Sequence, residues 1–319
     1  DRSAKHRMTA AILDEILVKQ LVGLSYEASE ANLSVAAGTN DGLNFTTGGF
    51  TDKQGELMLT LIDSVKQATF NQQELTLAQT EIRRKIENKV KGQSMSLAFA
   101  EFRNLVRLPS WSDQDLLVEL DKVTLADLTQ LRDDMFKQSA IRMLVVGNFT
   151  AKQAIALQQE VVKRAPVNAT AFYKMTRVQP EAKRRVTWSL SSEMGDAALA
   201  HIFVSTKAGE AGQVQAELLN KIAYSDFYDQ IRTQEQLSYS PFTASFPVDD
   251  YAAFGLFTQS PEKGPQHLQQ RYEYFVQQFA KKLAAYDQAE FDKIKQAYIA
   301  NFKKKPSNLD EEFAYLQGL

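Results

Sequence analysis

The sequence contains no cysteine, which excludes disulfide bonds, thiolate nucleophiles and cysteine metal ligands from its chemistry. Histidine is almost as scarce. None of the three histidines, His6, His201 and His267, belongs to an H-E-x-x-H or H-x-x-E-H motif, the helix-face pairs that bind a catalytic zinc. The motifs G-x-x-x-x-G-K-[ST] and G-x-S-x-G are absent as well. The residues therefore predict no complete catalytic centre and no metal site, and His201, inside an apolar stretch, is expected to be a core or edge residue.

The chain also lacks an excess of charge of one sign. Its 37 basic and 39 acidic residues leave a formal net charge of −2, which gives no global field to attract nucleic acid or an anionic membrane. No apolar run is long enough to span a bilayer, and the charged start from Asp1 to Met8 does not read as a signal peptide. With 44% hydrophobic and 24% charged residues, the composition is that of a globular protein without nucleic-acid partners or membrane spans.

One pattern of elements occurs twice along the 319 residues. Each copy reads as a helix, a β-hairpin and two further helices, with apolar residues at helical spacing in the helices and alternating in the strands. The distance from Tyr26 to Tyr239 nearly equals that from Glu74 to Glu290, so two anchors align the copies. The first copy is expected to contain a helix over 4–24, strands over 33–38 and 42–50 around an Asn40-Asp41-Gly42 turn, a helix through Met58 and Val65, and a helix from Gln73 to about Val90.

The second copy follows the same order. It is expected to contain a helix ending at Gln236, strands over 239–246 and 251–258 around a turn at Pro247 to Asp250, a helix through Leu268 and Phe279, and a last helix from Ala289 to Phe302. The shared order indicates that the two copies arose by duplication.

We therefore predict an α+β protein of two homologous domains, each an antiparallel sheet with helices packed on one side. The first repeat covers residues 1–165 and includes a buried strand over 141–146 and a helix to about Lys163. Residues 166–185, with two prolines and mixed charge, form a linker. The second repeat covers 186–319 and begins with strands over 186–190 and 198–204. Since the first repeat lacks such leading strands and the second lacks a closing strand and helix, the chain is expected to be part of a larger protein.

The most informative segment is the junction between helix and hairpin in the second copy. Arg232 falls in the last helical turn and Tyr239 opens the strand, so two long polar side chains can converge there. A purely structural role is also open. Arg232 could interact with the helix macrodipole or pair with Asp229 or Glu235, and Tyr239 could be an ordinary half-buried strand residue.

This junction carries a family resemblance. The segment Arg232-Thr233-x-Glu235-Gln236-Leu237-x-Tyr239, with 198–204 before it and 254–260 after it, resembles the C-terminal half of the pitrilysin/insulinase family of zinc metallopeptidases. The first copy, through Asn40-Asp41-Gly42-Leu43 and Val145-Val146-Gly147-Asn148, resembles the preceding domain of that family. The likeness covers nearly the whole chain and is strongest to the large bacterial, periplasmic members.

The resemblance implies half of a four-domain clam-shell whose two halves enclose unfolded or short peptides. Family members carry H-x-x-E-H in the first domain, where zinc activates water, so zinc is expected in a missing N-terminal half and no cofactor in this chain. Tyr239 would donate to the scissile carbonyl or its oxyanion, and Arg232 would hold a neighbouring carbonyl. The resemblance also implies a periplasmic location, with the cytoplasm as the alternative, and inactivity of this chain in isolation.

Two positions bear on that implication. Ser238 stands where family members most often have glycine, which affects the placement of Tyr239. The first copy has Leu24-Ser25-Tyr26 without a matching arginine, so Tyr26 is interpreted as structural.

Three hypotheses follow. The chain is the C-terminal, substrate-chamber half of a zinc metalloendopeptidase; or it belongs to a non-catalytic homologue that serves as a scaffold or assembly subunit; or it is a peptide-binding module that acts by strand addition at a sheet edge. Loss of Arg232 or Tyr239 would favour the second hypothesis, and both residues are present.

Overall fold

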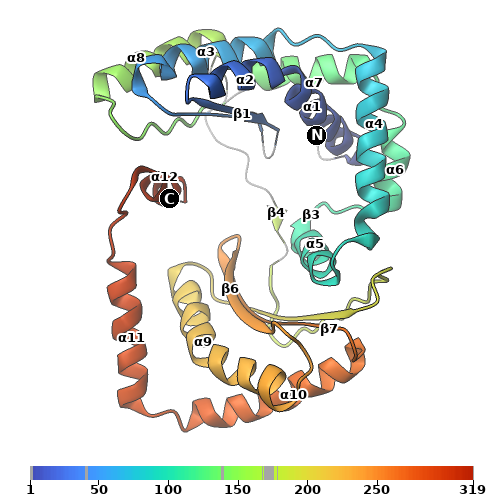
Figure 1. The fold of residues 1–319 in the computed structure, drawn as a ribbon, viewed down its shortest axis with the longest axis vertical. Helices are drawn as coiled ribbons and strands as arrows, with labels where there is room; N and C mark the ends of the chain where they lie inside the picture. The colour runs from blue at the N-terminus through green and yellow to red at the C-terminus, as the bar shows by residue number, and fades with distance from the viewer. Residues whose placement is uncertain are drawn as a thin grey trace. The chain divides into compact units, whose positions relative to one another are not determined.

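The computed structural model describes residues 3–39, 42–137, 140–166, 168, 176–177 and 179–318. The chain divides into two compact units (Figure 1). Unit 1 comprises Asp1–Ile86, Trp111–Lys174 and Lys305–Leu319, and unit 2 comprises Glu87–Ser110 and Met175–Lys304. Residues 87–110 thus pack in unit 2, although the sequence pattern predicted them within the first repeat. The domain limits 1–165, 166–185 and 186–319 stay a prediction, and part of the expected linker lies outside the described residues.

Unit 1 is mainly helical around one hairpin. Its elements are α1 (Ala4–Gln20), α2 (Val22–Glu30), β1 (Ser34–Gly38), β2 (Asn44–Gly48), α3 (Thr51–Lys66), α4 (Gln72–Glu87), α6 (Asp113–Leu120), α7 (Leu125–Lys137), α8 (Ala151–Arg164) and α12 (Leu309–Gln317).

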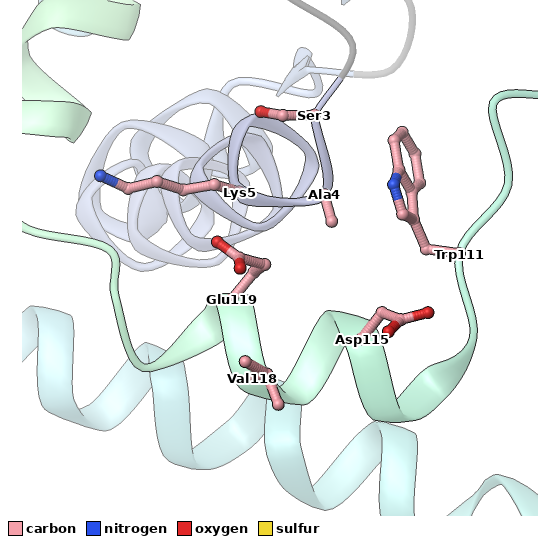
Figure 2. Close-up of a pocket in the computed structure, with 7 residues that line it drawn as sticks. All are labelled: Ser3, Ala4, Lys5, Trp111, Asp115, Val118 and Glu119. Atoms are coloured by element: carbon pink, nitrogen blue, oxygen red, sulfur yellow. The ribbon is translucent and has the colours of Figure 1, made fainter.

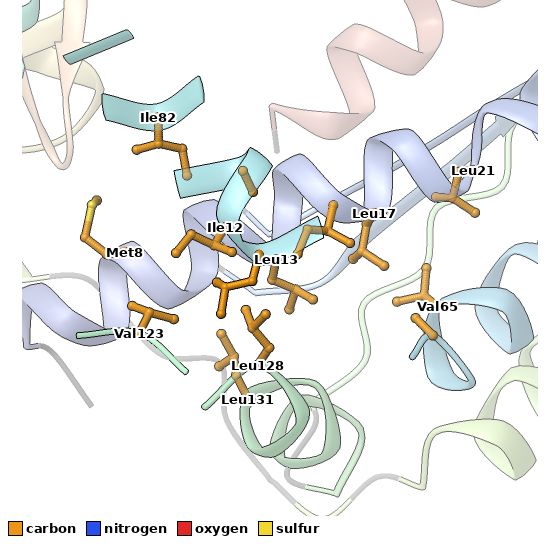
Figure 3. Packing of buried hydrophobic residues seen from close by; sticks show 14 of the residues in the cluster. Met8, Ile12, Leu13, Leu17, Leu21, Val65, Ile82, Val123, Leu128 and Leu131 are labelled. Carbon is orange, nitrogen blue, oxygen red and sulfur yellow. The ribbon is translucent and has the colours of Figure 1, made fainter. Parts of the chain in front are cut away.

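The core of unit 1 forms around α1. Apolar residues at helical spacing place Ile12, Leu13, Ile16 and Leu17 on one fully buried face of this helix (Figure 3). They pack with buried side chains of α3, α4, α6 and α7, among them Leu128. Each buried leucine or isoleucine contributes about 1.5–3 kcal/mol from removal of its surface from water. This burial explains why α1 is central, although its sequence also carries many charges.

The hairpin β1–β2 pairs antiparallel, from Ser34 opposite Gly48 to Gly38 opposite Asn44. Residues 40 and 41 of the expected turn lie outside the described part. Gly49 follows β2 with a φ of 122°, and a Cβ there would come within 2.6 Å of the Asn32 carbonyl oxygen. Glycine is therefore required at this position by both conformation and space.

Unit 2 is built on a three-stranded antiparallel sheet of order β5-β7-β6. Three short elements also belong to unit 2: η1 (Asn88–Lys91), β3 (Arg107–Leu108) and β4 (Thr176–Arg177). The sheet strands are β5 (Ala197–Val204), β6 (Phe242–Val248) and β7 (Tyr251–Ser260), and the helices are α5 (Ser94–Val106), α9 (Glu210–Tyr228), α10 (Pro265–Ala284) and α11 (Gln288–Phe302), with a π-helical turn η2 (Asp229–Gln234) after α9.

The alternation of side chains along β7 separates the two faces of this sheet. Phe254 and Leu256 point to the core shared with α9 and α10, where Phe227 packs edge-on against Tyr272 at a centroid distance of 5.2 Å. Phe257 points to the other face and stacks on Phe99 of α5 at 4.7 Å. The α+β class with antiparallel sheets is confirmed, and α5 adds a helix on the face opposite α9 and α10 (Figure 1).

Several predicted boundaries differ from the structure. The first helix, expected over 4–24, is interrupted at Leu21 and continues as α2 to Glu30. The strand expected from Tyr239 begins only at Phe242. Segments 141–146 and 186–190 were predicted as strands but are irregular, and no described strand pairs with them. A strand period in the sequence signals extended backbone, whereas a strand also needs a neighbour.

Candidate functional site

The segment that carries Arg232 leaves α9 through a widened helical turn. The backbone N–H of Glu235 donates to the carbonyl of Gln230 at 3.0 Å, the i to i−5 pattern of a π-helix. Leu237 N–H reaches further back, to the carbonyl of Ile231 at 2.9 Å. Arg232 was expected in an ordinary last turn of an α-helix; the π-turn arises because fully buried Ile231 and buried Leu237 both anchor in the core of unit 2. Single π-helical turns of this kind occur often at functional sites.

Beyond the π-turn the backbone reverses at Gln236, whose φ of 52° is left-handed. Ser238 is buried, and its hydroxyl donates to the carbonyl oxygen of Gln259 in β7 at 2.7 Å. The Oγ atom of Ser238 in turn accepts a hydrogen bond from the N–H of Ser240 at 3.3 Å. The left-handed residue of this segment is Gln236 and not Ser238, so the serine requires no glycine-like conformation. Its hydroxyl instead ties the loop to the sheet.

This loop brings Arg232 and Tyr239 together. The guanidinium carbon of Arg232 lies 4.5 Å from the ring centroid of Tyr239, while the Tyr239 side chain remains 80% exposed. On the other side the same carbon lies 5.3 Å from the ring centroid of Tyr228, and Nη1 of Arg232 donates a hydrogen bond to the Tyr228 hydroxyl. The guanidinium is therefore held between two tyrosine rings, with cation–π attraction of about 0.5–1 kcal/mol for each partly exposed contact.

The carboxylates near Arg232 in sequence are engaged elsewhere. Asp229 accepts a hydrogen bond from the Gln234 side-chain amide at 2.6 Å. Glu235 accepts two hydrogen bonds from Arg271 of α10, at 2.7 Å from Nε and 2.6 Å from Nη2, and this pairing raises the pKa of Arg271. In the part of the chain that the structure describes, Arg232 forms no ion pair. The simple electrostatic alternative, in which Arg232 pairs with Asp229 or Glu235, is therefore wrong.

None of the three histidines belongs to the segment that carries Arg232 and Tyr239. His201 lies in β5, an edge strand, stacked on Phe203 at 4.7 Å, and burial lowers its pKa. His6 lies in α1, where burial also lowers its pKa, and His267 is exposed in α10. Over the described ranges, no three histidine, aspartate or glutamate side chains gather closely enough to hold a metal ion. The residues present therefore do not fit a catalytic zinc.

Residues 1–119 match the family described as the middle or third domain of peptidase M16, and residues 218–316 match the PQQ synthase PqqF-like C-terminal lobe domain 4. Protease 3 of Salmonella typhi is 28% identical over 315 residues, 98% of this chain. The crystal structure of pitrilysin superposes on 99% of this chain with a TM-score of 0.91 and 28% identity. The chain belongs to the pitrilysin family of M16 peptidases.

This pitrilysin-family chain spans about a third of its relatives: 33% of Protease 3 and 34% of the pitrilysin chain. A structure described as the peptidase M16 inactive domain from Pseudomonas fluorescens also superposes, on 92% of this chain and 72% of its own, with a TM-score of 0.67 at 17% identity. That likeness concerns the fold alone. The matched domains are the middle and C-terminal ones, as the resemblance of the junction implied.

Two hollows of the pitrilysin-family chain lie away from Arg232 and Tyr239. One, of about 410 Å³, lies in unit 1 between the start of α1 and α6, where Figure 2 shows Lys5, Trp111 and Glu119 around it. Its charged groups have other partners: Lys5 pairs with Asp127 at 2.9 Å, and Asp115 caps α6. The other, of about 460 Å³, lies in unit 2 between α9 and the start of α11, with Tyr286 in its lining. Neither hollow gathers catalytic chemistry.

One member of the tyrosine–arginine stack was missed in the sequence. Tyr228 lies four residues before the segment that the sequence analysis singled out, and it was assigned no role. Its signal was present, because Tyr228 precedes Arg232 by four residues and neighbours at that spacing share a helix face.

Among the described residues, no helix is both long and apolar enough to cross a membrane.

Proposed function

We propose that this chain is the C-terminal, substrate-chamber half of a zinc metalloendopeptidase, which contributes contacts to the peptide but no metal. The observation that carries this proposal is the pair of half-buried Arg232 and exposed Tyr239. The guanidinium lies between two tyrosine rings, and no carboxylate of the described residues neutralises it. The family membership supports the same assignment, since the chain corresponds to about a third of Protease 3 and of the pitrilysin chain.

The chemistry of the pair follows from its donors. A tyrosine hydroxyl and an arginine guanidinium both donate hydrogen bonds without giving up their protons. Tyr239 would donate to the scissile carbonyl oxygen and to the oxyanion that develops on it, while Arg232 would hold the carbonyl of a neighbouring peptide unit. A fixed donor at a developing oxyanion contributes about 3 kcal/mol to transition-state stabilisation.

The remaining parts of the machinery are assigned to an N-terminal half of the same polypeptide. That half would carry the zinc and enclose unfolded or short peptides together with this chain. The isolated chain would then be inactive, because its own residues offer no metal site over the described ranges. We place the protein in the periplasm, which suits the cysteine-free sequence and the large bacterial members that it resembles.

The test is Tyr239→Phe in the complete polypeptide, with Tyr26→Phe as the matched control because both tyrosines follow a Leu-Ser pair. Loss of the Tyr239 hydroxyl is expected to lower kcat on a peptide substrate roughly 100-fold with little change in KM. The Tyr26 variant should keep the wild-type rate. An unchanged kcat for Tyr239→Phe would remove this residue from the mechanism.

A second measurement addresses the alternative of a non-catalytic homologue that acts as a scaffold or peptide-binding subunit. The complete polypeptide should cleave peptides in a zinc-dependent manner, whereas this chain alone with added zinc should not. Peptide binding without cleavage by the complete polypeptide would favour the alternative. Zinc-dependent cleavage by the isolated chain would overturn the assignment of the metal to the other half.

A further inference from the structure

The guanidinium of Arg232 is held from two unequal sides. Tyr239 lies in a loop and is 80% exposed, so its ring gives little restraint. Tyr228 is half-buried and is the last residue of α9. The residue before it, Phe227, is fully buried and packs edge-on against Tyr272 and Phe275. The rigid support for Arg232 therefore comes from the Tyr228 side.

Tyr228 offers Arg232 two kinds of contact. Its ring lies 5.3 Å from the guanidinium carbon, and its hydroxyl oxygen accepts the hydrogen bond from Nη1. A hydrogen bond and a ring face together fix both the direction and the plane of a guanidinium, which a single point contact does not. A free arginine side chain loses rotamer entropy when it binds, so prior restraint favours any later bond to a ligand.

A second tyrosine lies beside Tyr228 on the same face of α9. Tyr224, one helical turn earlier, stacks on it at a centroid distance of 6.2 Å and an interplanar angle of 21°. Tyr224 is 49% exposed. Over the described residues, it forms no hydrogen bond or cation–π contact with Arg232. Tyr224 and Tyr228 thus have the same chemistry on the same face of α9, but one of them reaches the guanidinium.

We propose that Tyr228 is a positioning residue: its hydroxyl and ring hold the Arg232 guanidinium so that its other N–H groups face a peptide carbonyl. The substrate side of this inference rests on the proposed function, whereas the restraint of Arg232 can be measured without substrate.

The restraint is tested on the 319-residue chain by NMR of its arginine guanidinium groups, with the Arg232 signal assigned from Arg232→Lys. In the wild type, this signal should be shifted by the ring currents and show slow rotation about the Nε–Cζ bond. Tyr228→Phe should keep most of the shift and lose the slow rotation. Tyr228→Leu should lose both, and Tyr224→Leu, the matched control, should change neither.

Kinetics of the complete polypeptide separate this inference from the proposed function. Tyr228→Phe is expected to lower kcat/KM about tenfold, the effect of one hydrogen bond to a charged group, and Tyr224→Phe should have no effect. Arg232 signals that are unchanged in both Tyr228 variants would overturn the inference, even if Tyr239→Phe lowers kcat. Altered Arg232 signals in the Tyr228 variants, together with an unchanged kcat for Tyr239→Phe, would support the positioning role and reject the proposed function.

Discussion

The same tripeptide, Leu-Ser-Tyr, adopts two different structures in this protein. Leu24-Ser25-Tyr26 lies inside helix α2 of unit 1, where the N–H of Ser25 donates to the Leu21 carbonyl as in any helix. Leu237-Ser238-Tyr239 lies in unit 2, after the π-turn, in the irregular backbone that leads to β6. The sequence pattern treated the two as equivalent junctions, but only the second is one. Equal local sequence therefore does not determine the local structure here.

The difference lies in the tertiary anchors. In unit 2, Glu235 is bound by Arg271 of α10 and Ser238 by the Gln259 carbonyl of β7. These bonds pull the chain out of the helix before Tyr239. In unit 1, Ser25 and Tyr26 are exposed, Tyr26 at 65%, so nothing competes with helical hydrogen bonding.

The basic side chains seven residues before the two tyrosines also differ in their partners. Lys19 occupies the position in α1 that Arg232 occupies before Tyr239, and it pairs with Glu15 at 3.6 Å. Arg232 has no such partner among the described residues and stacks between tyrosines. The cation before Tyr26 thus has a local carboxylate partner, whereas the cation before Tyr239 has none among the described residues.

The largest expected contrast between the two junctions comes from their leucines. Leu237 is buried in the core of unit 2, whereas Leu24 is partly exposed at the edge of the core of unit 1. Leu237→Ala should cost about 2–4 kcal/mol of stability, because it leaves a cavity. Leu24→Ala should cost about 1 kcal/mol or less. Urea unfolding, with hydrogen–deuterium exchange to resolve the two units, measures both, and equal costs would break the comparison.

The serines should give changes of opposite sign. Ser238→Ala removes the bond to the Gln259 carbonyl and should destabilise unit 2 by about 1–2 kcal/mol. Ser25→Ala, on an exposed helical face, should stabilise α2 by up to about 0.5 kcal/mol, because alanine favours the helix. The thermal midpoints of the two variants relative to wild type report these signs. A neutral Ser238→Ala would show that the hydroxyl does not anchor the loop.

The smallest expected contrast between the two segments concerns the residue before each leucine, where both changes have the same sign. Gln236 has a left-handed backbone, and Gly23 is helical with open space around its missing Cβ. Gln236→Gly and Gly23→Ala should therefore each stabilise the protein, by about 0.5–1 kcal/mol. Thermal unfolding measures both. The reverse result at either position, a lower midpoint, would contradict the backbone conformation assigned there.

The order of helices and hairpins could be predicted because apolar spacing reflects which face of an element is buried. The helices at Thr51–Lys66, Pro265–Ala284 and Gln288–Phe302 lie close to where the pattern indicated. The alternation of apolar residues could not decide whether 141–146 and 186–190 form strands, since strand pairing is a long-range property. The placement of α5 against the sheet of unit 2 was missed for the same reason.

For the candidate site, the sequence by itself determined which residues are present: an arginine and a tyrosine seven positions apart, with no cysteine and no zinc motif. Only the tertiary structure decided that the two side chains meet, since their contact depends on a π-turn held by buried Ile231 and on a loop held by Ser238. It also decided that Glu235 binds Arg271, so that Arg232 has no carboxylate partner among the described residues. Residue type fixes the available donors, whereas long-range packing and hydrogen bonds decide which of them stay free for a ligand.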